Sequence, residues 1–164
     1  MAENLNVDLM EIETEEMIQY IVVRFGEEQF GIDIKYIDNI VRMQRVTRVP
    51  NVQNYIKGVI NLRGEVIPVV SIRIKMGLEP DEITKATRII IIRLDNGETI
   101  GMLVDEVKEV VTLGESQVEK VQYDSKEEKT NYLFGVGHGE GENLISLLDV
   151  NLVFAEKEKE KANA

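Results

Sequence analysis

The stretch FGIDIKYIDNIV at residues 30–41 recurs in character as IGMLVDEVKEVV at residues 100–111, 70 positions later. Two further pairs of blocks follow in the same order. They are YIKGV at 55–59 with YLFGV at 132–136, and VIPVVSI at 66–72 with LISLLDV at 144–150. Three matched blocks in one order, with aligned glycines in two of them, indicate duplication of a unit of about 70 residues.

The residue pattern of each unit predicts a set of short strands. The runs at 20–25 and 30–34 flank Gly26-Glu27-Glu28, and the runs at 88–94 and 99–104 flank Asp95-Asn96-Gly97, so both pairs are predicted hairpins. The run of four isoleucines at 89–92 is too short for a confident helix and too apolar to face water, which predicts a strand buried on both faces. Further strands are expected at 59–62, 65–70, 110–113, 133–136 and 143–147. Helical structure is expected only as a turn near 52–55 and as short helices at 71–76 and 148–156.

This pattern predicts a mostly β fold built from two tandem, closed or partly closed antiparallel barrels, because closure removes exposed strand edges. The first barrel is expected at about 16–87 and the second at about 88–150, with a closing helix at about 148–156. Residues 1–15 are acidic and are expected to form a disordered tail, and residues 156–164 a charged one. Gly31, Gly58, Gly101 and Gly135 are expected at bulges or barrel corners.

Composition excludes several classes of protein. The chain has 164 residues, a formal net charge of −11, no cysteine and one histidine. These values argue against general nucleic-acid binding, disulfides and zinc sites, so no metal or cofactor is expected. No apolar run reaches the roughly 18 residues of a membrane span, and no signal peptide is evident, so the chain is expected to be cytoplasmic.

Catalytic patterns are scarce. His138 has no second histidine or cysteine to work with, and the glycines around it lack a phosphate-loop pattern. An acid/base enzyme would need a carboxylate pair such as Asp105 with Glu106, or Glu140 with Glu142. Adjacent carboxylates are common in acidic proteins, and we therefore expect no enzyme activity.

Charge is uneven along the chain. Residues 42–75 carry seven basic residues and one acidic residue, although the whole chain is acidic. This segment is either a solvated face or a surface for an acidic partner. Arg63 lies in a predicted turn that would hold its guanidinium in a defined place. An oligonucleotide- or oligosaccharide-binding barrel would also use this segment, but aromatic residues make up only 5% of the chain and tryptophan is absent.

After Gly31 and Gly101 the apolar spacing changes from two to three, at Ile37 and Ile40 and at Val107 and Val110. A strand leading into one helical turn, or a strongly bent strand, would present these residues on one face. They are either core residues or the lining of an apolar groove between the barrels.

The sequence KGVINLRGEVIPVV at 57–70, followed by Ile72-Arg73, resembles the signature of the CheW family of chemotaxis coupling proteins. Residues 100–110 and 132–150 resemble two further landmarks of that family, in the same order. The resemblance spans about Glu16 to Phe154. It implies two five-stranded, SH3-like barrels, in agreement with the duplication.

The resemblance also implies a function. It implies a non-catalytic cytoplasmic adaptor, without cofactor, that joins the regulatory domain of the histidine kinase CheA to the cytoplasmic tip of methyl-accepting chemotaxis receptors. Carried over by position, an apolar receptor groove would be formed by Ile34, Ile37, Val41, Val107 and Val110, with Arg63 near its edge. Gly58 and Val66 would lie in stretches that engage the kinase or the receptor.

Overall fold

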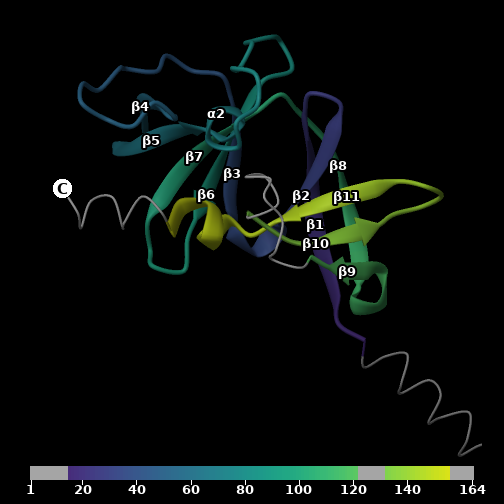
Figure 1. The fold of residues 1–164 in the computed structure, drawn as a ribbon. Coiled ribbons are helices and arrows are strands. Elements are labelled where there is room, and N and C mark those ends of the chain that lie inside the picture. Colours follow the sequence, from purple (N-terminus) through teal and green to yellow (C-terminus); the bar gives the residue numbers. More distant parts are fainter. Residues whose placement is uncertain (1–14, 122–131, 156–164) are drawn as a thin grey trace, which may run out of the picture.

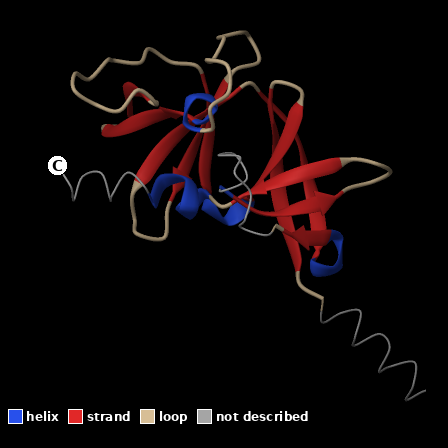
Figure 2. Cartoon of the chain, in the orientation of Figure 1, coloured by secondary structure: helices blue, strands red, loops and turns tan. Residues whose placement is uncertain are grey.

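A computed structural model of the chain describes residues 15–121 and 132–155. The predicted tails at 1–14 and 156–164 lie outside the described residues. Strands dominate the fold and the helices are short (Figure 2). The six-stranded sheet contains β1 (Met17–Phe25), β2 (Glu28–Asp33), β8 (Glu106–Gly114), β9 (Val118–Lys120), β10 (Leu133–His138) and β11 (Leu144–Leu148). The five-stranded sheet contains β3 (Ile37–Arg42), β4 (Ile56–Leu62), β5 (Glu65–Ser71), β6 (Arg88–Arg93) and β7 (Thr99–Val104).

The two sheets exchange hairpins between the repeat units. The order in one sheet is β8-β1-β2-β11-β10-β9 and in the other β3-β6-β7-β5-β4. The hairpin β1–β2 of the first unit therefore lies among strands of the second unit, and β6–β7 lies among strands of the first (Figure 1). Parallel pairing of β2 with β11 and of β7 with β5 joins the units. The boundary predicted at residue 88 thus divides the repeat units but not the sheets.

Each sheet closes back toward itself. Beyond β3 the chain returns to β4, where Thr47 and Val59 exchange two backbone hydrogen bonds of 2.8 Å. In the other sheet, the 3-10 helix η2 (Glu115–Gln117) joins β8 to β9, the two ends of the strand order, and β9 pairs with β10. This closure agrees with the predicted barrels, since it leaves few unpaired edges.

Three apolar clusters fill the fold, one inside each sheet and a larger one between the sheets. Along β6, Ile89 and Ile91 contact the cluster inside the five-stranded sheet, whereas Ile90 and Ile92 contact the cluster between the sheets, which we call the junction cluster. All four are at most 1% exposed, so the predicted two-sided burial of this strand is confirmed. The exchanged hairpins are apolar on both faces because each face meets a different cluster.

The two short helices after β5 and β11 are capped in the same way. In α2 (Ile72–Lys75) the Ser71 hydroxyl accepts a hydrogen bond of 3.2 Å from the Ile74 backbone N–H. In the helical turns at 150–155 the Asp149 carboxylate accepts one of 3.1 Å from Leu152 N–H, at the equivalent repeat position. Both helices were predicted, and serine and aspartate are favoured caps. Within the described part of the chain, no helix is long and apolar enough to span a membrane.

Candidate protein-interaction site

β-Bulges explain why apolar residues spaced three apart share one face. In β3 the pairing with β6 passes from Ile37–Ile92 to Asn39–Ile91 and so skips Asp38. In β8 the pairing with β1 passes from Val23–Val107 to Val22–Glu109 and skips Lys108. The skipped residue is an extra residue in its strand, so the alternation of side chains resumes one position later. Residues three apart across the bulge therefore project to the same face. Both strands therefore aim a spaced apolar pair toward the junction cluster.

The junction cluster brings together most of the predicted groove residues. Ile37 and Val107 are partly buried and pack against it. Val110 lies opposite Ile21, a member of the cluster, and paired residues project to the same face of a sheet. Val110 is 50% exposed and Ile34, in the 3-10 helix η1 (Ile34–Tyr36), is 39% exposed. These residues form an apolar rim on the edge strands β3 and β8.

Ile40 also packs against the junction cluster, as its spacing predicts, although the family resemblance did not assign it to the receptor groove. It is the repeat partner of Val110 and completes the pair on β3. The internal repeat contained this signal, since Ile40 follows Ile37 at the same spacing as Val110 follows Val107.

Val41 was predicted to belong to the same groove, but it lies elsewhere. It pairs with Ile89 and packs against the cluster inside the five-stranded sheet. The residue after Ile40 points to the opposite face of the strand because side chains alternate. Val41 is therefore placed apart from Ile37 and Val107.

Arg63 occupies the tight turn between β4 and β5. Its φ is 52° and that of Gly64 is 83°, and Gly64 N–H donates a hydrogen bond of 3.1 Å to the Asn61 side chain. Two successive positive φ values suit the twist of a two-residue hairpin. The predicted fixed placement of the guanidinium is consistent with this turn. Arg63 thus belongs to the β4–β5 hairpin, at the end of the five-stranded sheet order opposite β3, and its place near the edge of a receptor groove stays a prediction.

Gly58 and Val66 occupy very different environments on the same hairpin. Val66 is 64% exposed, so it is accessible to a partner. Gly58 is buried, and a Cβ atom at this position would lie 2.2 Å from the carbonyl oxygen of Thr47. Gly58 follows a register shift in β4, as Gly135 does in β10, in agreement with the predicted bulges. Gly58 therefore acts by allowing the sheet to close.

A charged cluster links the two sheets where the chain crosses between them. The Asp105 carboxylate accepts a hydrogen bond of 2.9 Å from Arg73 Nε, a second from Arg73 Nη2, and one of 2.8 Å from the Gly26 backbone N–H. Arg24 Nη1 lies 3.6 Å from the same carboxylate. Burial acts to raise the pKa of Asp105. The hydrogen bonds from Arg73 and Gly26 and the charges of Arg73 and Arg24 outweigh burial and lower the pKa below its usual value.

The candidate catalytic groups do not converge. Asp105 lines a cavity of about 160 Å³ with Arg24, Arg73, Glu82 and Thr84, but Arg73 and Gly26 bind both of its carboxylate oxygens. His138 is exposed and lies 3.3 Å from the exposed Glu119. No group of three His, Asp or Glu side chains suited to a metal ion occurs within the described residues.

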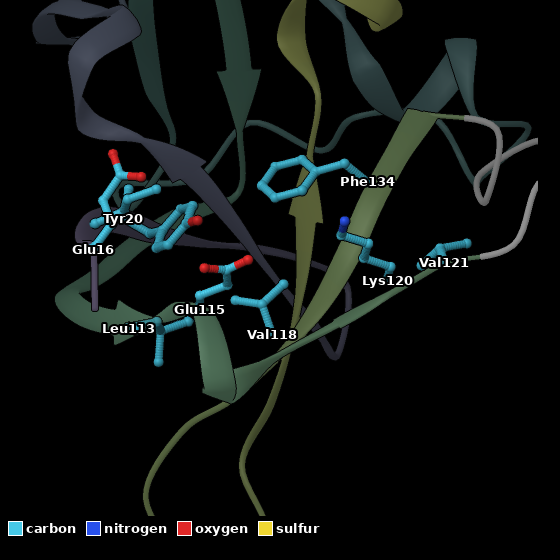
Figure 3. A pocket seen from close by; sticks show the side chains of 10 residues that line it. Glu16, Tyr20, Leu113, Glu115, Val118, Lys120, Val121 and Phe134 are labelled. Carbon is cyan, nitrogen blue, oxygen red and sulfur yellow. The ribbon is translucent and has the colours of Figure 1, made fainter. Parts of the chain in front are cut away.

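A second apolar feature lies at one end of the six-stranded sheet. A cavity of about 460 Å³ is lined by side chains from β1, β8 and β10, among them Tyr20, Leu113 and Phe134 (Figure 3). The rings of Tyr20 and Phe134 lie 6.4 Å apart, and burial raises the pKa of Tyr20. Nothing in the sequence distinguished these aromatic residues from ordinary core residues.

Comparisons with known proteins agree with this architecture. Residues 19–158 match the CheW-like domain family. The chain is similar to a chemotaxis protein CheW of Bacillus subtilis, with 35% identity over 93% of this chain and 95% of the relative. It is also similar to a chemotaxis protein CheW of Helicobacter pylori, with 33% identity over 84% of this chain and 82% of the relative.

A solved structure shares the fold. It is the crystal structure of the scaffolding protein TtCheW from Thermoanaerobacter tengcongensis, which matches with a TM-score of 0.76 and 27% identity and covers 85% of this chain and 88% of that chain. The family match covers most of the chain, and the two curated relatives match it over most of their own lengths. The chain therefore belongs to the CheW-like domain family.

Proposed function

We propose that this protein is a non-catalytic adaptor of chemotaxis signalling that binds both the cytoplasmic tip of methyl-accepting receptors and the regulatory domain of the kinase CheA. Family membership carries this proposal, together with the similarity to a protein described as a scaffold. The adaptor holds the kinase at the receptor and transfers no phosphate itself. Its binding partners recruit it to receptor arrays beneath the membrane.

The apolar rim on β3 and β8 is the proposed receptor surface. It offers partly exposed apolar side chains on two edge strands, around the junction cluster. A receptor tip made of helices would present an apolar stripe to such a rim, as an amphipathic helix does in a hydrophobic groove. Because these side chains are only partly buried, docking covers apolar surface without unfolding the protein.

The resemblance leaves open whether the hairpin β4–β5 engages the kinase or the receptor, and we assign it to the kinase. Val66 is the most exposed large apolar side chain that the structure shows, and it lies beside the Arg63 turn. The basic side chains of Arg42, Arg45, Arg48 and Lys57 are also exposed on the five-stranded sheet and the loop after β3. This charge favours an acidic partner and predicts binding that weakens as salt increases.

Calorimetry with the two isolated partners tests this proposal. The wild-type protein should bind the regulatory domain of a chemotaxis kinase near one-to-one, and a helical receptor-tip fragment saturably. Val66→Asp should weaken kinase binding, and Val110→Asp should weaken receptor binding, because each places an unpaired charge in an apolar contact. Ile83→Asp is the matched control, since Ile83 is 53% exposed and belongs to neither surface.

One pattern of binding supports the proposal, and two others contradict it. Loss of binding to one partner only, with Ile83→Asp unchanged, supports the two surfaces. Failure of the folded wild-type protein to bind either partner contradicts the adaptor function. Wild-type binding that neither substitution affects contradicts the placement of the surfaces.

A further inference from the structure

Asp105 is the single residue between β7, in the five-stranded sheet, and β8, in the six-stranded sheet. Groups from both sheets meet at its carboxylate. Arg73 comes from α2, which follows β5 of the five-stranded sheet, and Gly26 comes from the turn between β1 and β2 of the six-stranded sheet. The Asp105 carboxylate therefore links the sheets at a crossover. Arg73 holds it from the end of the five-stranded sheet, and Gly26 of the six-stranded sheet donates a hydrogen bond to it; we call the pair of Arg73 and Asp105 the clasp.

The clasp has geometry that fixes orientation. Arg73 binds both carboxylate oxygens, and the side chains of Arg73 and Asp105 are only 15% and 13% exposed. Its remaining nitrogen, Nη1, donates a hydrogen bond of 3.0 Å to the carbonyl oxygen of Glu79. A two-pronged guanidinium–carboxylate pair is directional as well as charged, so it fixes the carboxylate that accepts the hydrogen bond from Gly26 of the other sheet.

The clasp also holds the start of β8. Asp105 N–H donates a hydrogen bond of 3.1 Å to the carbonyl oxygen of Arg24, and Arg24 Nη2 lies 3.4 Å from Glu106. Val107, which packs against the junction cluster, directly follows Glu106 in the chain. The position of this side of the apolar rim is thus tied to the charged cluster through one short stretch of backbone.

The other crossover, from β2 to β3, is built differently. Its position equivalent to Asp105 in the repeat is Lys35, whose side chain is 65% exposed. Lys35 interacts with Asp33 at 3.8 Å and with the ring of Tyr36, both in the same connection. On that side the link between the sheets is a surface pair, in which Asn151 donates a hydrogen bond of 3.0 Å to Asp95. The charged link is therefore present at only one of these two related crossovers.

We propose that Arg73 and Asp105 are positioning residues for receptor binding, which set the Val107 side of the apolar rim without touching the receptor. This inference rests on the proposed function. If the clasp is broken, the sheets sample several orientations, and only a fraction of molecules presents a complete rim. The apparent affinity for the receptor falls in proportion to that fraction.

Calorimetry of full-length clasp variants with a helical receptor-tip fragment and with the kinase regulatory domain tests the inference. We expect Asp105→Asn and Arg73→Gln each to raise the Kd for the receptor fragment about fivefold, which corresponds to a competent fraction of about one fifth. The double variant should lose no more than either single variant, since both remove the same link. Binding to the kinase domain should stay unchanged, because Val66 lies near the turn end of the β4–β5 hairpin, whereas Arg73 follows the other end of β5.

The matched control is Asn151→Ala at the related surface pair, which should leave receptor binding unchanged. Methyl NMR adds a measurement of local structure, because a general loss of stability would not change the chemical shifts of one methyl group selectively. The Val107 methyl signals should shift in both clasp variants, and those of Val69, inside the five-stranded sheet, should not. If Asp105→Asn does not fold, Arg73→Lys retains the charge without the two-pronged contact and should show a smaller loss.

Three outcomes distinguish this inference from the proposed function. Wild-type protein that binds no receptor fragment contradicts the proposed function. Wild-type binding that folded clasp variants retain at full strength overturns the inference alone. Equal loss of receptor and kinase binding also overturns it, because a general loss of folded protein would then explain the result.

Discussion

At the scale of single residues, Gly58 shows how one backbone position determines closure of a sheet. Its φ is 145°, and a Cβ atom there would lie 2.2 Å from the Thr47 carbonyl oxygen, which belongs to the closing bridge. An L-residue would meet both an unfavourable backbone conformation and a backbone atom that cannot move aside. The resemblance assigns Gly58 to an interaction surface, whereas its geometry accounts for a structural role.

We predict that Gly58→Ala lowers the free energy of unfolding by about 3 kcal/mol, through backbone strain and loss of closure. Gly64→Ala is the control, because Gly64 has a φ of 83° but no atom within 4 Å of the added Cβ. It should cost only about 1 kcal/mol. Urea unfolding measures both values, and equal losses for the two variants would contradict this account of Gly58.

Asp105 gives a pH-dependent prediction. Its folded-state pKa is lowered, so it stabilises the fold above the unfolded pKa, and this contribution is lost as the pH falls through the folded pKa. The difference in unfolding free energy between wild type and Asp105→Asn should therefore be largest near neutral pH and shrink below about pH 4. Urea titrations across this range measure the difference, and one that stayed constant would show that the Asp105 charge does not stabilise the fold.

At the scale of elements, the β4–β5 turn places Arg63 in a conformation that costs stability. A non-glycine residue with a φ of 52° is strained by about 1 kcal/mol, and asparagine tolerates this region better than arginine. We predict that Arg63→Asn unfolds at the same or a higher urea concentration than wild type. If Arg63 serves an interaction surface, the same variant should bind a partner more weakly. A marked loss of stability would instead show that Arg63 supports the fold.

The sequence allowed most elements to be predicted because the information was local. The isoleucine run predicted a strand buried on both faces, and Ser71 and Asp149 lie at the starts of the two expected helices. The exchange of hairpins was not predicted, because two copies of one unit have the same local pattern whichever sheet they join. The clasp was missed for a related reason: Arg73 and Asp105 lie in two separate stretches, 32 positions apart in sequence, and nothing in the sequence pairs them.

The candidate site was only partly predictable. Repeat spacing predicted one shared face for Ile37, Ile40, Val107 and Val110. The family resemblance alone added Val41 to the groove. The side that Val41 faces depends on the bulge at Asp38, which is defined by pairing with β6. Such a bulge is a property of two strands, so one strand's sequence does not reveal it.

At the scale of the whole molecule, the exchanged hairpins make the two halves interdependent. Residues 1–87 lack β6 and β7, the central strands of the five-stranded sheet, and residues 88–164 lack β1 and β2 of the other. We predict that neither fragment unfolds cooperatively alone, and that mixing them restores a cooperative transition, because each then buries the other's apolar hairpin. Circular dichroism on heating measures this. Cooperative unfolding of an isolated fragment would contradict the interdependence.

As an adaptor, one molecule of this protein is proposed to join two partners. Sedimentation velocity of the protein mixed with a kinase regulatory domain and a helical receptor-tip fragment tests this claim most directly. The proposed separation of the β4–β5 hairpin from the β3 and β8 rim predicts a species containing all three components, with each partner bound as tightly as it is alone. Displacement of one partner by the other would contradict the claim, because both would then compete for a single surface.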